Sequence, residues 1–136
     1  MGTHIIIKHY MHKNKIIIFY LLLLLFHVAH VFEEAWGHFW IMDSIFGPGR
    51  FLALNWLLLC IPFVLFYFTL NEKRWAYILS IVYAGIMILN GIGHNIATLV
   101  TGRYFGGFAG GFTGIGLIII GTILFYYLKS SLPLRH

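Results

Sequence analysis

Four long apolar stretches dominate this sequence and limit what it can fold into. They cover residues 16–40, 51–70, 75–100 and 108–128. Each has close to the ~20 residues that a helix needs to cross ~30 Å of hydrocarbon. Short polar or glycine-containing segments at 42–50, 71–74 and 101–107 separate them and predict turns. The pattern predicts an all-α protein that forms a four-helix transmembrane bundle.

The composition fits a membrane protein better than a soluble one. Of the 136 residues, 60% are hydrophobic and only 10% are charged, a balance that a soluble domain of this size could not hide from water. We expect one membrane domain at 16–128, a basic leader at 1–15 and a short tail at 129–136. The leader is expected to be disordered or interfacial, and it lacks a following cleavage site, which predicts an uncleaved first span.

Lysine and arginine residues lie at the ends of the apolar stretches. Two of them, Arg50 and Arg103, fall on one side of the predicted bundle. Seven fall on the other side: Lys8, Lys13, Lys15, Lys73, Arg74, Lys129 and Arg135. Because cytoplasmic loops carry the excess of Lys and Arg, we expect a multi-pass protein of the plasma membrane with both termini in the cytoplasm. The charges form no basic stripe, so nucleic acid is not an expected partner.

Five ionisable residues gather near the end of the first apolar stretch. They are His27, His30, Glu33, Glu34 and His38. At 100° per residue they share one helix face about 140° wide. Each carboxylate would cost ~2.5–3.5 kcal/mol at the centre of a bilayer, so a divalent cation, a protonated histidine or a proton on the carboxylate must neutralise it. The stretch therefore predicts a polar site inside the bundle.

The third apolar stretch carries a second polar set at a matching depth. Asn90 and His94 are four residues apart and so lie on one helix face. Both sets are expected in the extracytoplasmic half of the bilayer, where they can face each other. We expect His30, Glu34 and His94 to hold a divalent metal, zinc or iron. We expect Glu33, Glu34 and Asn90 to act in catalysis.

A glycine-rich run precedes and opens the fourth apolar stretch. It contains Gly106, Gly107, Gly110, Gly111 and Gly114. Small residues at this spacing let helix backbones approach one another closely inside a membrane. The run therefore predicts tight packing of the fourth helix against a neighbour.

Two polar strings in this chain together resemble a known family. His30, Glu33 and Glu34 form His-x-x-Glu-Glu, and Asn90 and His94 form Asn-x-x-x-His. With the later residues Arg103, Tyr104, Gly107 and Thr113, the strings resemble the bacterial membrane family named for its HxxEE motif. The resemblance covers most of the chain and implies a small integral membrane protein whose site includes both strings and, more weakly, Tyr104 and Gly107. That family has no assigned biochemical role, and its Tyr-x-Pro-Gly turn lacks the proline here.

The residues favour a metal-dependent membrane enzyme acting on a lipidic or membrane-embedded substrate. Zinc would suit a hydrolase or acyltransferase and iron an oxygenase, with the spare glutamate as general base. One alternative is a proton- or ion-coupled transporter, which with four short spans would have to be a homo-oligomer. Another is a haem- or quinone-binding bundle.

Several polar residues also have structural readings. Glu33 and Glu34 could form a structural ion pair with His30 or His94 that fixes helix register. His27 could be a satisfied core histidine, and His38 could lie at the interface. Arg103 and Tyr104 suit the outer interface as a lipid-phosphate contact and an aromatic anchor. The single cysteine, Cys60, is expected to be a buried small hydrophobe.

Overall fold

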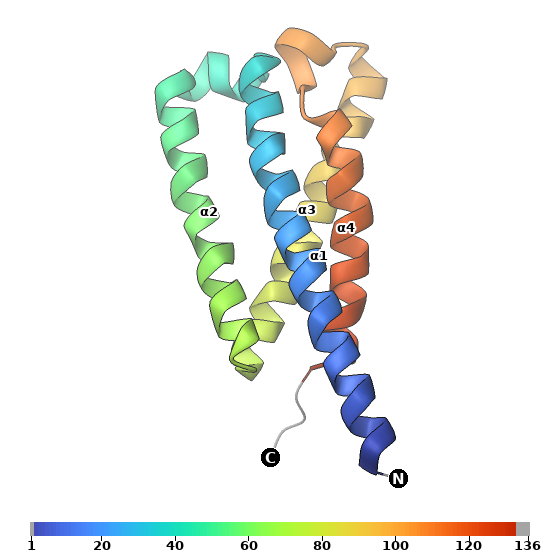
Figure 1. Ribbon diagram of the computed structural model, residues 1–136. Coiled ribbons are helices and arrows are strands. Elements are labelled where there is room, and N and C mark those ends of the chain that lie inside the picture. Colours follow the sequence, from blue (N-terminus) through green and yellow to red (C-terminus); the bar gives the residue numbers. More distant parts are fainter. Residues whose placement is uncertain (1, 133–136) are drawn as a thin grey trace.

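The protein is a bundle of four long helices joined by short connections (Figure 1). The structure, a computed structural model, describes the backbone of residues 2–132 and the side chains of residues 12–132. The segments in order are α1 (Gly2–Trp36), η1 (Met42–Phe46), α2 (Pro48–Leu70), α3 (Arg74–Thr101), η2 (Tyr104–Phe108) and α4 (Gly111–Ser130). Here η1 is a single π-helical turn, and η2 is a kinked turn whose backbone is not helical at Phe105 and Gly106. The four α helices are long and apolar enough to cross a membrane, which confirms the predicted all-α, four-helix architecture.

The first helix differs from the prediction at both ends. It is helical from Gly2, so the leader is continuous with the first span and the expected backbone disorder is wrong. It ends at Trp36 instead of residue 40, because His38 adopts a left-handed conformation with φ of 53° that an α-helix cannot contain. Arg135 and the side chain of Lys8, two of the seven charges counted above, lie outside the described part of the chain.

Helices α1, α3 and α4 form the close-packed part of the bundle, and α2 packs more loosely. The most apolar stretch of α2 has 22% of its residues buried, against 39% in α1 and α3. The core between the helices is filled by large side chains with no exposed surface, among them Tyr20, Leu23, Leu117 and Leu124. In Figure 1, α2 stands at one side of the other three helices. Cys60 lies on the exposed face of α2. The expected burial of this cysteine is therefore wrong.

Helices α3 and α4 approach each other through glycines. A methyl group added to Gly91 would collide with the backbone carbonyl of Gly114, and one added to Gly114 would lie 3.1 Å from the Gly91 Cα. Such close contact is possible only where neither residue carries a side chain. The structure thus confirms the predicted tight packing of the fourth helix and identifies α3 as its neighbour.

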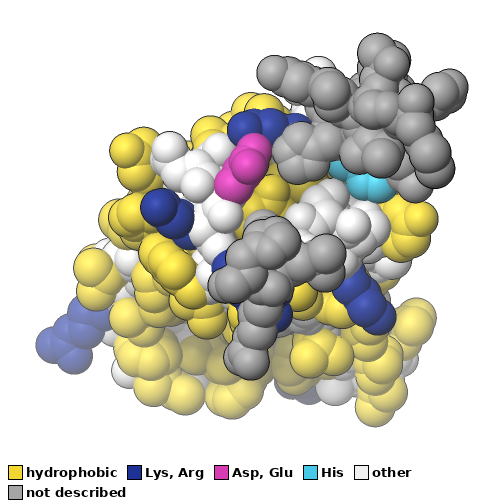
Figure 2. All heavy atoms as spheres, turned by 90° about the horizontal axis from the view of Figure 1, so that it is seen from below, with side chains coloured by type: hydrophobic (Ala, Val, Ile, Leu, Met, Phe, Trp, Pro, Cys, Tyr) yellow, Lys and Arg dark blue, Asp and Glu magenta, His cyan; other side chains and the backbone are white. Residues whose placement is uncertain are grey.

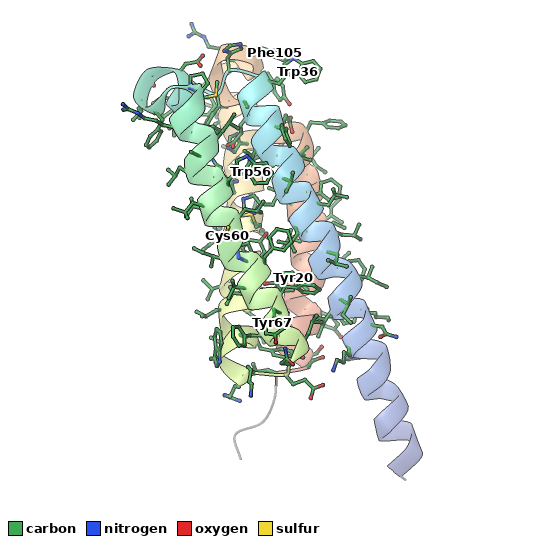
Figure 3. All side chains as sticks on the ribbon, turned by 60° about the vertical axis from the view of Figure 1, so that its left-hand side comes forward. Tyr20, Trp36, Trp56, Cys60, Tyr67 and Phe105 are labelled. Atoms are coloured by element: carbon green, nitrogen blue, oxygen red, sulfur yellow. The ribbon has the colours of Figure 1, made fainter. Side chains whose placement is uncertain are left out.

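The two ends of the bundle carry different groups. The start of α1, the end of α4 and the turn between α2 and α3 lie on one side, and η1 and η2 lie on the other (Figure 1). Figure 3 shows Trp36 and Phe105 at the end that carries η1 and η2, and Tyr67 near the opposite end. Trp36 is 83% exposed and Phe105 is 72% exposed. Such exposed aromatic rings near helix ends are typical of the interfaces of a membrane.

We expect Gly91→Ala to destabilise the protein, because its new methyl group would enter the α3–α4 contact. Overpacking of this kind costs ~1–3 kcal/mol. Gly93 lies on the same helix with open space where a Cβ would be, so Gly93→Ala should be neutral or stabilising by roughly 0.5–1 kcal/mol. Thermal unfolding of both variants in detergent measures the difference, and equal midpoints would contradict this packing.

Candidate metal centre

One glutamate and two histidines meet inside the bundle near the end that carries η1 and η2. His30 and Glu34 lie one turn apart on α1, and His94 reaches them from α3. The Glu34 Oε1 atom is 3.0 Å from His94 Nε2 and 3.6 Å from His30 Nε2. The three residues are only 1% to 6% exposed. The structure therefore brings together the three residues that the sequence predicts as metal ligands.

The spacing of the three ligand atoms suits a tetrahedral metal. Ligands at ~2.0–2.1 Å from a four-coordinate zinc lie roughly 3.3 Å from one another. The two distances to Glu34 Oε1 lie on either side of this value. Three protein ligands leave one position for water or substrate, which is the pattern of catalytic rather than structural zinc sites.

Hydrogen bonds orient both imidazoles with Nε2 toward Glu34. His94 Nδ1 donates to the Phe108 carbonyl oxygen at 3.2 Å. His30 Nδ1 donates to Thr113 Oγ1 at 3.0 Å, and the Thr113 hydroxyl donates to a carboxylate oxygen of Glu33. A histidine that donates from one ring nitrogen presents the other as a base, as metal-ligating histidines do. Both rings therefore direct Nε2 at Glu34 Oε1, and a metal bound to His30 Nε2 would take the place of the hydrogen bond that this atom accepts from Asn90.

Glu33 has a different place from its neighbour Glu34. Its carboxylate accepts hydrogen bonds from the backbone N–H groups of Phe112 (3.0 Å) and Thr113 (2.7 Å). These are free donors at the N-terminus of α4, where the helix dipole favours negative charge. Glu33 therefore holds the start of α4 against α1 and reaches the metal centre only through Thr113. The structure separates the two carboxylates that the sequence groups in one site.

The two outlying histidines lie outside the three-residue cluster. His38 follows the end of α1, is exposed, and contacts the Asp43 carboxylate through Nδ1 at 3.2 Å. The single helix face predicted for all five residues is therefore wrong, because α1 ends before His38. His27 is buried and its Nδ1 lies 3.1 Å from the Tyr83 hydroxyl. It is a satisfied histidine just beneath the centre.

Asn90 lies directly against the cluster. Its Nδ2 donates to His30 Nε2 at 2.9 Å, and its side chain is half-buried. The amide is therefore in direct contact with one of the three candidate ligands. Of the other residues implied by the family resemblance, Thr113 joins the centre, whereas Tyr104 and Gly107 lie in η2.

Sequence reasoning missed two residues that shape the centre. Gly110 has φ of 122°, and a Cβ there would lie 2.7 Å from His30 Cε1 and 2.8 Å from His94 Nδ1. Only glycine fits this backbone conformation and this contact. Phe39 covers His94 with ring centroids 4.9 Å apart. The glycine-rich run was the available signal for Gly110. Its spacing predicts close helix packing, but it does not predict that the His30 and His94 rings lie against this residue.

We expect Thr113→Val to weaken metal binding roughly 10- to 100-fold, as loss of an outer hydrogen bond to a ligating histidine does. The variant keeps the shape of the side chain but removes the hydroxyl between His30 and Glu33. Thr122→Val is the matched control, because Thr122 lies on the same helix and its exposed hydroxyl bonds to Ile118 O. Titration of metal-free protein with Zn²⁺ compares the two, and equal affinities would show that Thr113 does not support His30.

Comparison with known proteins adds no relative. The chain matches no protein-family model, and no curated protein or solved structure is significantly similar to it. What this centre can do chemically is therefore inferred from its own atoms.

Proposed function

We propose that this protein is a metal-dependent membrane enzyme that acts on a lipidic or membrane-embedded substrate. One observation carries the proposal: two buried imidazoles, each held by an oxygen acceptor on Nδ1, point Nε2 at one oxygen of the buried Glu34 carboxylate. A buried carboxylate needs a compensating charge, and a divalent cation between these three atoms supplies it. The donor set suits zinc, for hydrolysis or acyl transfer, or iron, for hydroxylation or desaturation.

The residues around the centre divide the work. His30, Glu34 and His94 would hold the metal, which would polarise a substrate carbonyl or activate a water. The Asn90 amide, next to His30 Nε2, would donate a hydrogen bond to a substrate oxygen at the open position. We assign Glu33 a positioning role in place of the general-base role expected from the sequence, because its oxygens accept hydrogen bonds from α4.

Membership of the HxxEE-motif family is part of the same proposal. The two strings that define the resemblance lie on α1 and α3, and their residues meet in one hydrogen-bonded group. Thr113 of α4 links that group to Glu33. A single site built from all three segments gives a physical reason for the strings to occur together.

We also propose that both termini lie in the cytoplasm, with the metal centre toward the outer side of the plasma membrane. Lys13, Lys15, Lys73, Arg74 and Lys129 lie at the end that carries the termini. Figure 2 views this end and shows Lys and Arg side chains around it. The opposite end carries Arg50 and Arg103. This excess of positive charge is typical of the cytoplasmic side.

We expect purified wild-type protein to hold roughly one divalent metal per chain, and both Glu34→Gln and His94→Gln to lose it. His38→Gln should keep it, because His38 is exposed and bonds to Asp43 outside the cluster. Elemental analysis of the four proteins, purified in detergent without chelator, gives the stoichiometry. Metal in none of them, or equal metal in all of them, would refute the metal centre.

We expect a membrane-impermeant maleimide to label Ser44→Cys but not Asn71→Cys in intact cells, each in a Cys60→Ala background. Ser44 lies in the exposed turn η1, and Asn71 is exposed in the turn between α2 and α3. The two positions lie at opposite ends of the bundle. Labelling of both should follow when the membrane is permeabilised, and the reverse pattern in intact cells would place the termini outside.

A further inference from the structure

A long cleft of about 720 Å³ separates α2 from α3. Its volume falls within the ~300–1,000 Å³ that small-molecule sites occupy. Its walls are largely apolar and include Leu58, Ile61, Leu65, Leu79, Val82 and Ile86. Ile61 is 56% exposed and Ile86 is 53% exposed, so the cleft opens along its side to the surface that faces lipid. A molecule could therefore enter it from the bilayer.

The cleft is polar at one end. Asn55 of α2 and Asn90 of α3 line it there. Farther along α3, Tyr83 lies between Asn90 and Leu79, and its hydroxyl is 3.1 Å from Nδ1 of His27, which also lines the cleft. Asn90 also donates to His30 Nε2 at 2.9 Å. The polar end is therefore continuous with the metal centre, whereas Leu65 and Leu79 line the far end.

The length of the cleft matches one leaflet of a membrane. Leu65 is ten positions after Asn55 on α2, and Asn90 is eleven positions after Leu79 on α3. At ~1.5 Å per residue the cleft is about 15 Å long, half of the ~30 Å hydrocarbon thickness. A single extended hydrocarbon chain fits this shape and polarity, because it has one apolar body and one polar end.

We propose that this cleft binds one acyl chain of a membrane lipid and presents its carbonyl end to the metal centre. The chain lies between α2 and α3 with its tail toward Leu65 and Leu79, where each buried methylene contributes about 0.8 kcal/mol. Its carbonyl group lies at Asn90 and accepts the hydrogen bond of the amide. The statement about the carbonyl rests on the proposed metal-dependent function, but binding of the chain does not.

The experiment uses a fatty acid with a diazirine in mid-chain, photo-crosslinked to purified protein in detergent and mapped by mass spectrometry. Labels should concentrate on the cleft walls and disappear with excess unlabelled fatty acid. Ile86→Trp narrows the cleft and should lower this labelling roughly tenfold, the effect of about two lost methylene contacts. Ile96→Trp is the matched control, because Ile96 is 55% exposed on the same helix and lies outside the cleft.

Two further measurements separate the proposals. Leu58→Trp narrows the cleft from the opposite wall and should repeat the loss if Ile86→Trp does not fold. Both narrowing variants should keep their metal, and His94→Gln should keep saturable labelling of the walls. Labelling spread evenly over the lipid-facing surface and unchanged by either variant identifies ordinary surrounding lipid and overturns the acyl site. Saturable labelling of a wild-type protein that holds no metal supports the acyl site and refutes the proposed enzyme.

Discussion

The buried carboxylate of Glu34 is the constraint on which the rest of this structure depends. It lies in an apolar bundle with only 6% of its surface exposed, and an unpaired charge in such a place costs several kcal/mol. His30 from the same helix and His94 from α3 both turn Nε2 toward it. Both histidines therefore contact the same carboxylate oxygen, and hydrogen bonds to Nδ1 hold the two rings in this position.

The connection between α3 and α4 contacts both histidine rings and helps to fix their positions. It supplies the Phe108 carbonyl to His94, and it passes over both rings at Gly110, where a side chain would not fit. The start of α4 supplies Thr113 to His30 and two backbone donors to Glu33. The two adjacent glutamates therefore have different roles. Glu34 places a carboxylate between the two histidines, and Glu33 holds the start of α4 so that Thr113 can bond to His30.

The loose packing of α2 has the opposite consequence. A site that is closed on all sides within a membrane would exclude lipid. Here the close-packed helices α1, α3 and α4 form the centre, and α2 stands at their side. The cleft between α2 and α3 ends at Asn90, which touches both the cleft and His30. The cluster of His30, Glu34 and His94 therefore lies among the closely packed helices, and the open cleft lies beside α2.

The four membrane-length helices and the cluster of His30, Glu34 and His94 could be predicted from the sequence, because hydrophobic length defines a membrane helix and 100° per residue places His30 and Glu34 on one face. The face could not show where α1 ends, since that depends on the left-handed backbone at His38. The predicted helix face also could not show that Glu33 bonds to α4. Consecutive residues of a helix point 100° apart, so Glu33 and Glu34 meet different neighbours. Helix ends, outer hydrogen bonds and the cleft depend on contacts between distant segments, and only the tertiary structure decided those.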